Sequence, residues 1–306
     1  MRKTRKRRNR RNKKSKKGKS KQTFKRENCA PHAGKILKFT CYSPQSLHKL
    51  KDLWNGRHRD QKILSNDPRE IWRSLKYGLS KVCGRESCWL KQKIFKHKLD
   101  NDMTDFTFAP GAPKTWEKKP FEWLTSVEMN TVMKQYEKAY PCFEFLGPSP
   151  IDFDKHKMYG ECVWEEICQF DLKKSIKRGK TKIGLIFNLD PHNLEGSHWI
   201  CMFINIPEKE IYFFDSYGDK PPKEVKVFMK RVQKQSRTLG REFKIITNTK
   251  RHQRSESECG MYSLYIIIEL LKGMQSFKEL SSTRIPDKRV KILRKVYYNQ
   301  GIKEKK

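Results

Sequence analysis

The chain has 306 residues, which is enough for one or two domains with a real hydrophobic core. Its formal net charge is +35, and a charge of this size predicts attraction to polyanions such as nucleic acid. No apolar run approaches the roughly 20 residues of a membrane-spanning helix, and the basic N-terminus lacks the apolar stretch of a secretory signal peptide. We therefore expect neither a membrane span nor a secretory signal.

Residues 1–26 form a basic tail, with sixteen Lys or Arg and no acidic residue. A segment of this composition cannot bury a core, so we expect it to be disordered. It suits nucleic-acid binding, a nuclear address or packaging into a virion, and a solvated tail without a private role is the alternative. The other 280 residues still carry a charge of +19, because 35 minus 16 leaves 19.

The nine cysteines are odd in number and scattered along the chain. Without a secretory signal this usage indicates a reducing compartment with free thiols rather than a disulfide framework. Cys83 and Cys88 form a close pair of the kind seen in zinc sites, but such sites need four ligands and His97 is the one further candidate nearby. We expect packing cysteines there, and we predict no metal and no cofactor.

Residues 27–118 are predicted to form a helical arm domain. Residues 44–53 have helical spacing, and a second helix should begin at Pro68 with Asp67 as its N-cap. Residues 101–118 are rich in Pro and polar side chains and resemble a linker.

Residues 119–306 are predicted to form the catalytic domain. A helix should begin at Thr125 or Ser126, with Glu128 in its first turn. The expected elements that follow are an extended stretch over 143–154, a helical segment near 160–178, a strand over 182–190 that is apolar on both faces, and a basic helix over 285–298 that packs on the core.

Residues 198–218 are the best hairpin in the sequence, with two apolar strands around a turn at 207–210. If Ile206 pairs with Ile211, the alternation of strand side chains puts Asp215 on the same side as His198. Four residues of offset would remain between them, or roughly 13 Å, which is too far for a hydrogen bond unless the strand curls.

Cys259 lies where a polar loop over 251–258 meets the apolar run that follows Gly260. This change predicts a buried helix with Cys259 at its N-terminus. The partial positive charge and free N–H groups of a helix N-terminus favour a thiolate, which is the nucleophilic form. A buried structural cysteine is the alternative reading of this position alone.

The ordered set of four residues supplies the parts of a cysteine protease. Cys259 would be the nucleophile, and His198 would take its proton and later protonate the leaving amine. Asp215 would hold the imidazole in the right tautomer. The amide of Gln253, with the backbone N–H of Cys259, would form an oxyanion hole, in which one donor typically contributes about 3 kcal/mol.

These residues resemble the SUMO-specific protease family. The resemblance rests on the string GSHW, an Asp seventeen residues after that His in FFDSYG, and Gln253 six residues before Cys259-Gly260, and it covers about 180–275. The adenovirus protease is a more distant relative with the same residue order. WLTSVEMNTVM, FEFLGPSPIDFD and YFFDSYGDKPP are similar to the core-polyprotein proteases of large nucleocytoplasmic DNA viruses, of asfivirus and mimivirus type.

The resemblance implies an α/β papain-like core with permuted order, a mixed central sheet flanked by helices, and a helical arm in front of it. It also implies cleavage after Gly-Gly in viral structural polyproteins, in the virion and the host cytoplasm, with a nuclear location as an alternative. Trp199 would then wall a channel that admits only glycines, because a substrate Cβ would collide with its ring.

Several other classes of protein share part of this pattern. A chymotrypsin-like cysteine protease has the same order but would follow its nucleophile with strands, papain has the reverse order, and caspases carry a different string around the cysteine. Removal of SUMO or ubiquitin-like proteins from host conjugates keeps the fold and changes the substrate. A basic nucleic-acid-binding structural protein of the virion is the alternative outside enzymes, and the intact set of four residues argues against it.

Overall fold

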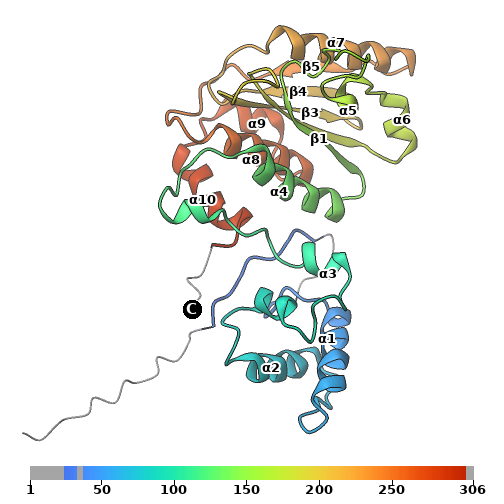
Figure 1. Cartoon of the computed structure of the whole chain (residues 1–306). Helices are drawn as coiled ribbons and strands as arrows, with labels where there is room; N and C mark the ends of the chain where they lie inside the picture. Colours follow the sequence, from blue (N-terminus) through green and yellow to red (C-terminus); the bar gives the residue numbers. More distant parts are fainter. Residues whose placement is uncertain (1–23, 33–36, 301–306) are drawn as a thin grey trace, which may run out of the picture.

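The structure is a computed structural model that describes residues 24–32 and 37–300. Figure 1 shows two lobes, with a small helical lobe from the N-terminal part of the chain lying beside a larger lobe built around a sheet. Nearly all of the predicted basic tail, residues 1–23, lies outside the described residues. Within the described ranges, no helix is both long enough and apolar enough to cross a bilayer.

The helical lobe confirms the helices expected in the arm. Asp67 caps its helix by accepting the N–H groups of Arg69 and Glu70 at 3.0 and 2.9 Å. The expectation of an irregular linker over 101–118 is partly wrong, because Asp100 accepts the N–H of Met103 at 2.8 Å and starts a short helix there. The elements of this part of the chain are α1 (Pro44–Arg57), α2 (Pro68–Leu79), η1 (Glu86–Lys91), α3 (Asn101–Asp105) and η2 (Lys114–Glu117).

The arm has a hydrophobic cluster of its own, whose buried members all lie between Cys41 and Phe108. Trp116 instead packs with the buried residues of the larger lobe. The division of the chain at residue 118 remains a prediction.

The larger lobe contains a five-stranded mixed sheet in the order β1-β2-β3-β4-β5. β1 and β5 each pair in parallel with their neighbour, and the three middle strands pair antiparallel. The expected strand over 182–190 is β2, an interior strand. The strands are β1 (Phe143–Pro150), β2 (Lys182–Asn188), β3 (Trp199–Asn205), β4 (Glu210–Phe214) and β5 (Lys244–Thr247).

Helices cover both faces of this sheet, as Figure 1 shows for α7 on one side and for α8 and α4 on the other. Alternate residues of β3 belong to two different hydrophobic clusters, one on each face. Burial on both faces explains why the strands read as continuous apolar runs. The helices are α4 (Ser126–Ala139), α5 (Glu165–Cys168), α6 (Leu172–Lys177), α7 (Lys223–Thr238), α8 (Cys259–Lys272), α9 (Phe277–Ser282) and α10 (Asp287–Tyr297).

Capping side chains set where several of these helices begin. Thr125 and Glu128 form a capping box at the start of α4, as the sequence predicts. The helical segment expected near 160–178 is split, because Asp171 accepts the N–H of Lys174 at 2.9 Å and begins α6 as a separate helix.

The prediction of free thiols throughout is wrong. Three pairs are disulfides, Cys29–Cys41, Cys83–Cys88 and Cys162–Cys168, with Cα atoms 5.1, 5.6 and 6.2 Å apart. These separations fall in the normal range for disulfides. Cys142, Cys201 and Cys259 are free. The odd number of cysteines gave no indication of this pairing, because each pair of sulfur atoms comes together only in the folded chain.

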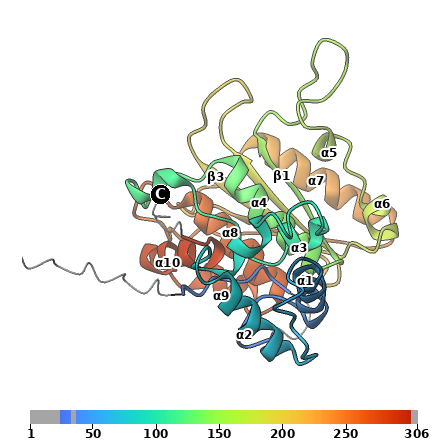
Figure 2. The same ribbon diagram turned by 60° about the horizontal axis from the view of Figure 1, so that its bottom comes forward.

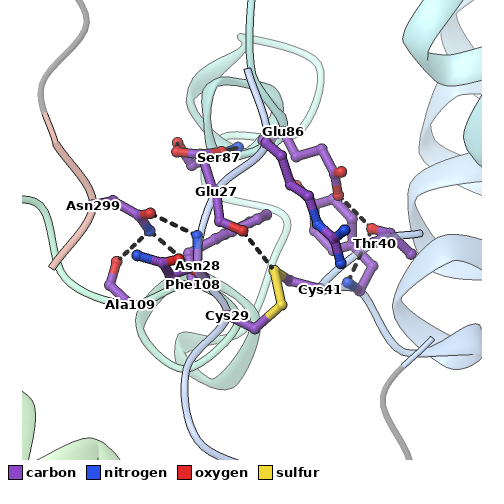
Figure 3. Close-up of a disulfide and its surroundings, with 12 residues drawn as sticks. Glu27, Asn28, Cys29, Thr40, Cys41, Glu86, Ser87, Phe108, Ala109 and Asn299 are labelled. Carbon is purple, nitrogen blue, oxygen red and sulfur yellow. Dashed lines mark hydrogen bonds between the residues drawn. A yellow bond between two sulfur atoms is a disulfide. The ribbon is translucent and has the colours of Figure 1, made fainter. Parts of the chain in front are cut away.

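Asn299 joins the arm to the C-terminal end of the larger lobe, beside the Cys29–Cys41 disulfide (Figure 3). Its side-chain oxygen accepts the N–H of Asn28 at 2.7 Å, and its amide donates to the carbonyls of Asn28 and Ala109 at 3.0 and 2.9 Å. The segment before the disulfide and the segment after α3 are therefore fixed by one side chain that lies two residues after the end of α10.

Candidate active site

Cys259 is the first residue of α8 and is 2% exposed. The helix begins here because the polar loop over 251–258 gives way to side chains that are buried on nearly every side. Gly260 lets the N-terminus of α8 lie against Leu124, since a Cβ at this position would come within 3.1 Å of the Leu124 Cβ. The thiol is thus held at the helix end that carries partial positive charge.

His198 directly precedes β3, and Asp215 directly follows β4. The hairpin register differs from the prediction by two residues, because Ile204 rather than Ile206 pairs with Ile211. The shift preserves which side each residue faces and halves the offset between His198 and Asp215. The Nε2 of His198 donates to the Asp215 Oδ1 at 2.8 Å, so the distance problem posed by the sequence disappears.

The electrostatics of His198 favour its charged form. Burial by itself would lower the pKa of the imidazole. Hydrogen bonds to Asp215 and Cys259 and the negative charges of these groups act in the opposite direction and raise the pKa to about 9. Because Nε2 bonds to Asp215, Nδ1 is the ring nitrogen left for the hydrogen bond with Cys259. The arrangement can supply a protonated imidazole beside a thiol at neutral pH.

Gln253 is completely buried and lies in the loop before α8. Its side-chain oxygen accepts the hydroxyl of Ser216 at 2.7 Å, while its amide nitrogen donates to the Ser255 carbonyl at 2.5 Å and the Tyr217 hydroxyl at 3.3 Å. The structure therefore places Gln253 beside the loop that carries Asp215. Both of these partners belong to the protein, so the assignment of Gln253 to the oxyanion hole stays a prediction.

Two residues that the sequence reasoning missed support Asp215. Asn248 accepts the N–H of Asp215 at 2.9 Å and donates to its carbonyl at 2.8 Å. Tyr217 donates its N–H to the Asp215 Oδ1 at 2.8 Å and stacks on the His198 ring with centroids 4.7 Å apart. The aromatic in FFDSYG was visible in the sequence, whereas Asn248 comes from the end of β5 and gave no signal.

One stretch of the chain matches a known family of proteases. Residues 180–304 match the Ulp1 protease family, C-terminal catalytic domain, and this range contains all four proposed site residues. This stretch of the chain is a Ulp1-like protease domain. The chain is therefore a cysteine protease with a mixed sheet flanked by helices.

Two viral proteins are similar in sequence to this protease. A protein of Acanthamoeba polyphaga mimivirus assigned as a thiol protease is 29% identical over 294 residues, covering 90% of this chain and 95% of its own. A SUMO-1 cysteine protease of African swine fever virus is 30% identical over 173 residues, covering 54% of this chain and 63% of its own. The crystal structure of a protease of the same virus has a TM-score of 0.62 at 22% identity, covering 90% and 96% of the two chains, and shows the shared fold.

Trp199 directly follows His198 and lies at the wall of a groove of about 450 Å³. Its indole N–H donates to the Leu124 carbonyl at 2.9 Å, which fixes the ring against the start of α4. Trp123 lines the same groove and is 42% exposed. Trp123 is the first residue of the string WLTSVEMNTVM, and nothing in the sequence alone assigns it to the site.

Two loops border this groove at the end of the sheet. The loop before α5 contributes Lys157 and Val163, and the loop before β3 contributes residues 190–192 and 194–196. Figure 2 shows both loops projecting beyond the body of the protease. The groove therefore lies between long loops, and Trp199, the residue after His198, lines it.

One group of side chains in the described ranges has the composition of a metal site. The ligand atoms of His156, Cys162 and Cys168 lie within 4.8 Å of one another. The two sulfur atoms are joined as a disulfide, so we assign no metal to them. The pair Cys83 and Cys88, for which zinc was weighed from the sequence, is likewise a disulfide.

Proposed function

We propose that the protease cleaves after Gly-Gly pairs in viral structural polyproteins, with Cys259 as nucleophile. The observation that carries the proposal is the hydrogen-bonded pair of His198 and Asp215 beside a cysteine at the N-terminus of α8. The viral origin of the relatives favours polyproteins of a virion as substrates.

In the proposed reaction, the Cys259 thiolate attacks the scissile carbonyl carbon, and the charge moves to the carbonyl oxygen. The backbone N–H of Cys259 and the amide of Gln253 donate to this oxyanion. The imidazolium of His198 then protonates the leaving amine as the C–N bond breaks. His198 next takes a proton from water, which attacks the thioester and releases the new carboxylate.

The preference for glycine is supported by the two indoles at the groove. Trp199 is fixed by its bond to the Leu124 carbonyl, so its ring cannot swing away to admit a larger residue without losing that bond. Trp123 lies on the same groove. A substrate Cβ pressed against the fixed Trp199 ring would collide with it, whereas glycine presents only backbone.

A panel of Gly-Gly-X peptides analysed by mass spectrometry tests this function. The wild type should cleave after the second Gly, and Cys259→Ala should leave every peptide intact. Trp199→Ala should extend cleavage to peptides with Ala in place of one Gly, while Trp72→Ala in the arm should leave the selectivity unchanged. Cleavage that ignores the glycines in the wild type would refute the proposed selectivity.

Removal of SUMO or a ubiquitin-like protein is the second candidate, and the names of the African swine fever virus relatives favour it. A SUMO fusion and a peptide with the same Gly-Gly-X junction separate the two functions. A kcat/KM at least tenfold higher for the fusion would favour deconjugation. Equal values would favour polyprotein processing in the virion or the host cytoplasm.

We also propose that the enzyme contacts nucleic acid, because residues 27–306 carry a net charge of +19 and the tail over 1–26 adds +16. Binding to DNA should weaken steeply with salt, with a slope set by the number of phosphates that are neutralised. A chain lacking residues 1–23 should show a smaller salt slope than the full chain. Equal slopes would remove the tail from the contact.

A further inference from the structure

The C-terminal segment that includes α10 holds the loop before Cys259 at several points. The N–H of Ile285 donates to the His252 Nδ1 at 3.1 Å. The N–H of Arg254 donates to both carboxylate oxygens of Asp287, each at 3.2 Å. The sequence predicts only that this basic helix packs on the core, and these contacts give it a direct connection to the site.

The third connection is an ion pair between Glu258 and Arg294. Glu258 directly precedes the proposed nucleophile, and the Arg294 Nε donates to its Oε2 at 3.2 Å. The two side chains are 0% and 3% exposed. Separating a fully buried ion pair costs a large free energy, because each partner alone would be an uncompensated charge in the interior.

Arg294 also holds the backbone on the N-terminal side of the cysteine. Its Nη2 donates to the Ser257 carbonyl at 3.3 Å, and its guanidinium lies over the Trp116 ring, 4.7 Å from the centroid. The hydroxyl of Ser257 donates to the other carboxylate oxygen of Glu258 at 3.0 Å. Both residues before Cys259 are therefore fixed to one arginine.

The peptide unit that this arginine fixes contains a proposed oxyanion donor. The N–H of Cys259 and the carbonyl of Glu258 belong to the same planar peptide group. That carbonyl accepts the N–H of Tyr262 at 2.9 Å as the first bond of α8. The N–H at the start of a helix has no partner within the helix, so it is free to serve a substrate oxygen.

We propose that Glu258 and Arg294 are positioning residues that aim the Cys259 N–H at the oxyanion of the reacting carbonyl. Neither residue touches the substrate. They act by fixing the plane of the Glu258–Cys259 peptide through the Glu258 side chain and the Ser257 carbonyl. The inference rests on the proposed role of Cys259 as nucleophile, but not on the preference for Gly-Gly.

Two reactions of Cys259 separate this role from a merely structural one. Acylation by p-nitrophenyl acetate passes through an oxyanion, whereas alkylation by iodoacetamide does not. Both are measured on the full chain, and the rates of Cys259→Ala are subtracted. The variants are Glu258→Ala, Glu258→Gln, Arg294→Met and Arg294→Lys. The control is Arg231→Met on α7, which removes an ion pair with Asp154 at 3.1 Å and a bond to the Ile167 carbonyl at 2.8 Å.

We expect Glu258→Ala and Arg294→Met to slow acylation by about 10–100-fold. This is less than the full effect of losing one oxyanion donor, because the N–H remains and is only misdirected. The same variants should change the rate of alkylation by less than about threefold. Glu258→Gln should be milder, because its amide oxygen still accepts from Arg294. Arg231→Met should change neither rate. Circular dichroism identifies any variant that fails to fold. If Glu258→Ala or Arg294→Met does not fold, the acylation and alkylation rates of Glu258→Gln and Arg294→Lys test the proposal instead.

Unchanged acylation in the folded variants would overturn the proposal, and so would an equal fall in acylation and alkylation, which indicates general damage to the site. A wild type that reacts no faster than Cys259→Ala would give a different pattern. It would refute Cys259 as nucleophile, and this inference would fall with it.

Discussion

Replacing Asp215 with Asn should move the alkaline limb of the pH–rate profile to lower pH. The Asp215 carboxylate accepts the Nε2–H of His198 at 2.8 Å, and with Cys259 it raises the pKa of His198 from 6.5 to about 9. One pKa unit corresponds to about 1.4 kcal/mol, so the net stabilisation of the imidazolium, after burial has acted against it, is about 3 kcal/mol. The enzyme should therefore keep its general acid up to about pH 9.

The Asn variant loses the charge and keeps the shape. An opposite charge at this distance shifts a pKa by about 1–3 units, so the limb should fall by about that much. A shift of about 2 units would reduce the protonated fraction of His198 at pH 8 by about tenfold. Burial acts in the same direction in the variant, because it lowers the pKa of the imidazole.

The assay is kcat/KM on a fluorogenic Gly-Gly peptide between pH 5 and pH 10, with a direct NMR titration of the His198 imidazole. Asp219→Asn is the control, since Asp219 is an exposed acid on the same loop. Reading the position of the limb rather than its height separates the lost charge from any loss of ring orientation. A limb that stays near pH 9 in Asp215→Asn would refute the argument.

The remaining predictions concern the nucleophile, the oxyanion hole and a buried histidine. Cys259→Ala should abolish cleavage while the circular dichroism spectrum stays unchanged, and residual cleavage would reject the assignment. Gln253→Ala should lower kcat by about 10²–10³ in steady-state assays, with little change in KM, if its amide serves the oxyanion; an unchanged kcat would leave it a structural role between Ser216 and Ser255. Burial, followed by the charges of Lys250 and Arg284, lowers the pKa of His252 to about 4. The unfolded chain protonates His252 below about pH 6.5, whereas the folded chain protonates it only below about pH 4. The free energy of unfolding should therefore fall as the pH drops from about 6.5 to about 4. His252→Asn should reduce that pH dependence in urea titrations, and parallel curves for the two proteins would contradict it.

The sequence by itself determined the elements whose signals are local. Asp67, Thr125 and Glu128 marked helix starts because a cap is formed by residues within three positions of each other. The apolar run after Gly260 predicted α8, and the side on which Asp215 lies followed from strand alternation alone, whatever the register. The family resemblance came from the spacing of His198, Asp215, Gln253 and Cys259 along the chain.

Only the tertiary structure decided what depends on distance between segments. The register that brings His198 within 2.8 Å of Asp215 is set by the packing of both faces of β3, which turn chemistry alone did not reveal. The disulfides escaped prediction for the same reason, since their partners meet only after folding. Asn248, which directly follows β5, bonds to Asp215 across 33 residues of sequence, and Arg294 of α10 bonds to Glu258 across 36. A polar side chain that is buried because it bonds to a partner distant in sequence leaves no local pattern in the sequence.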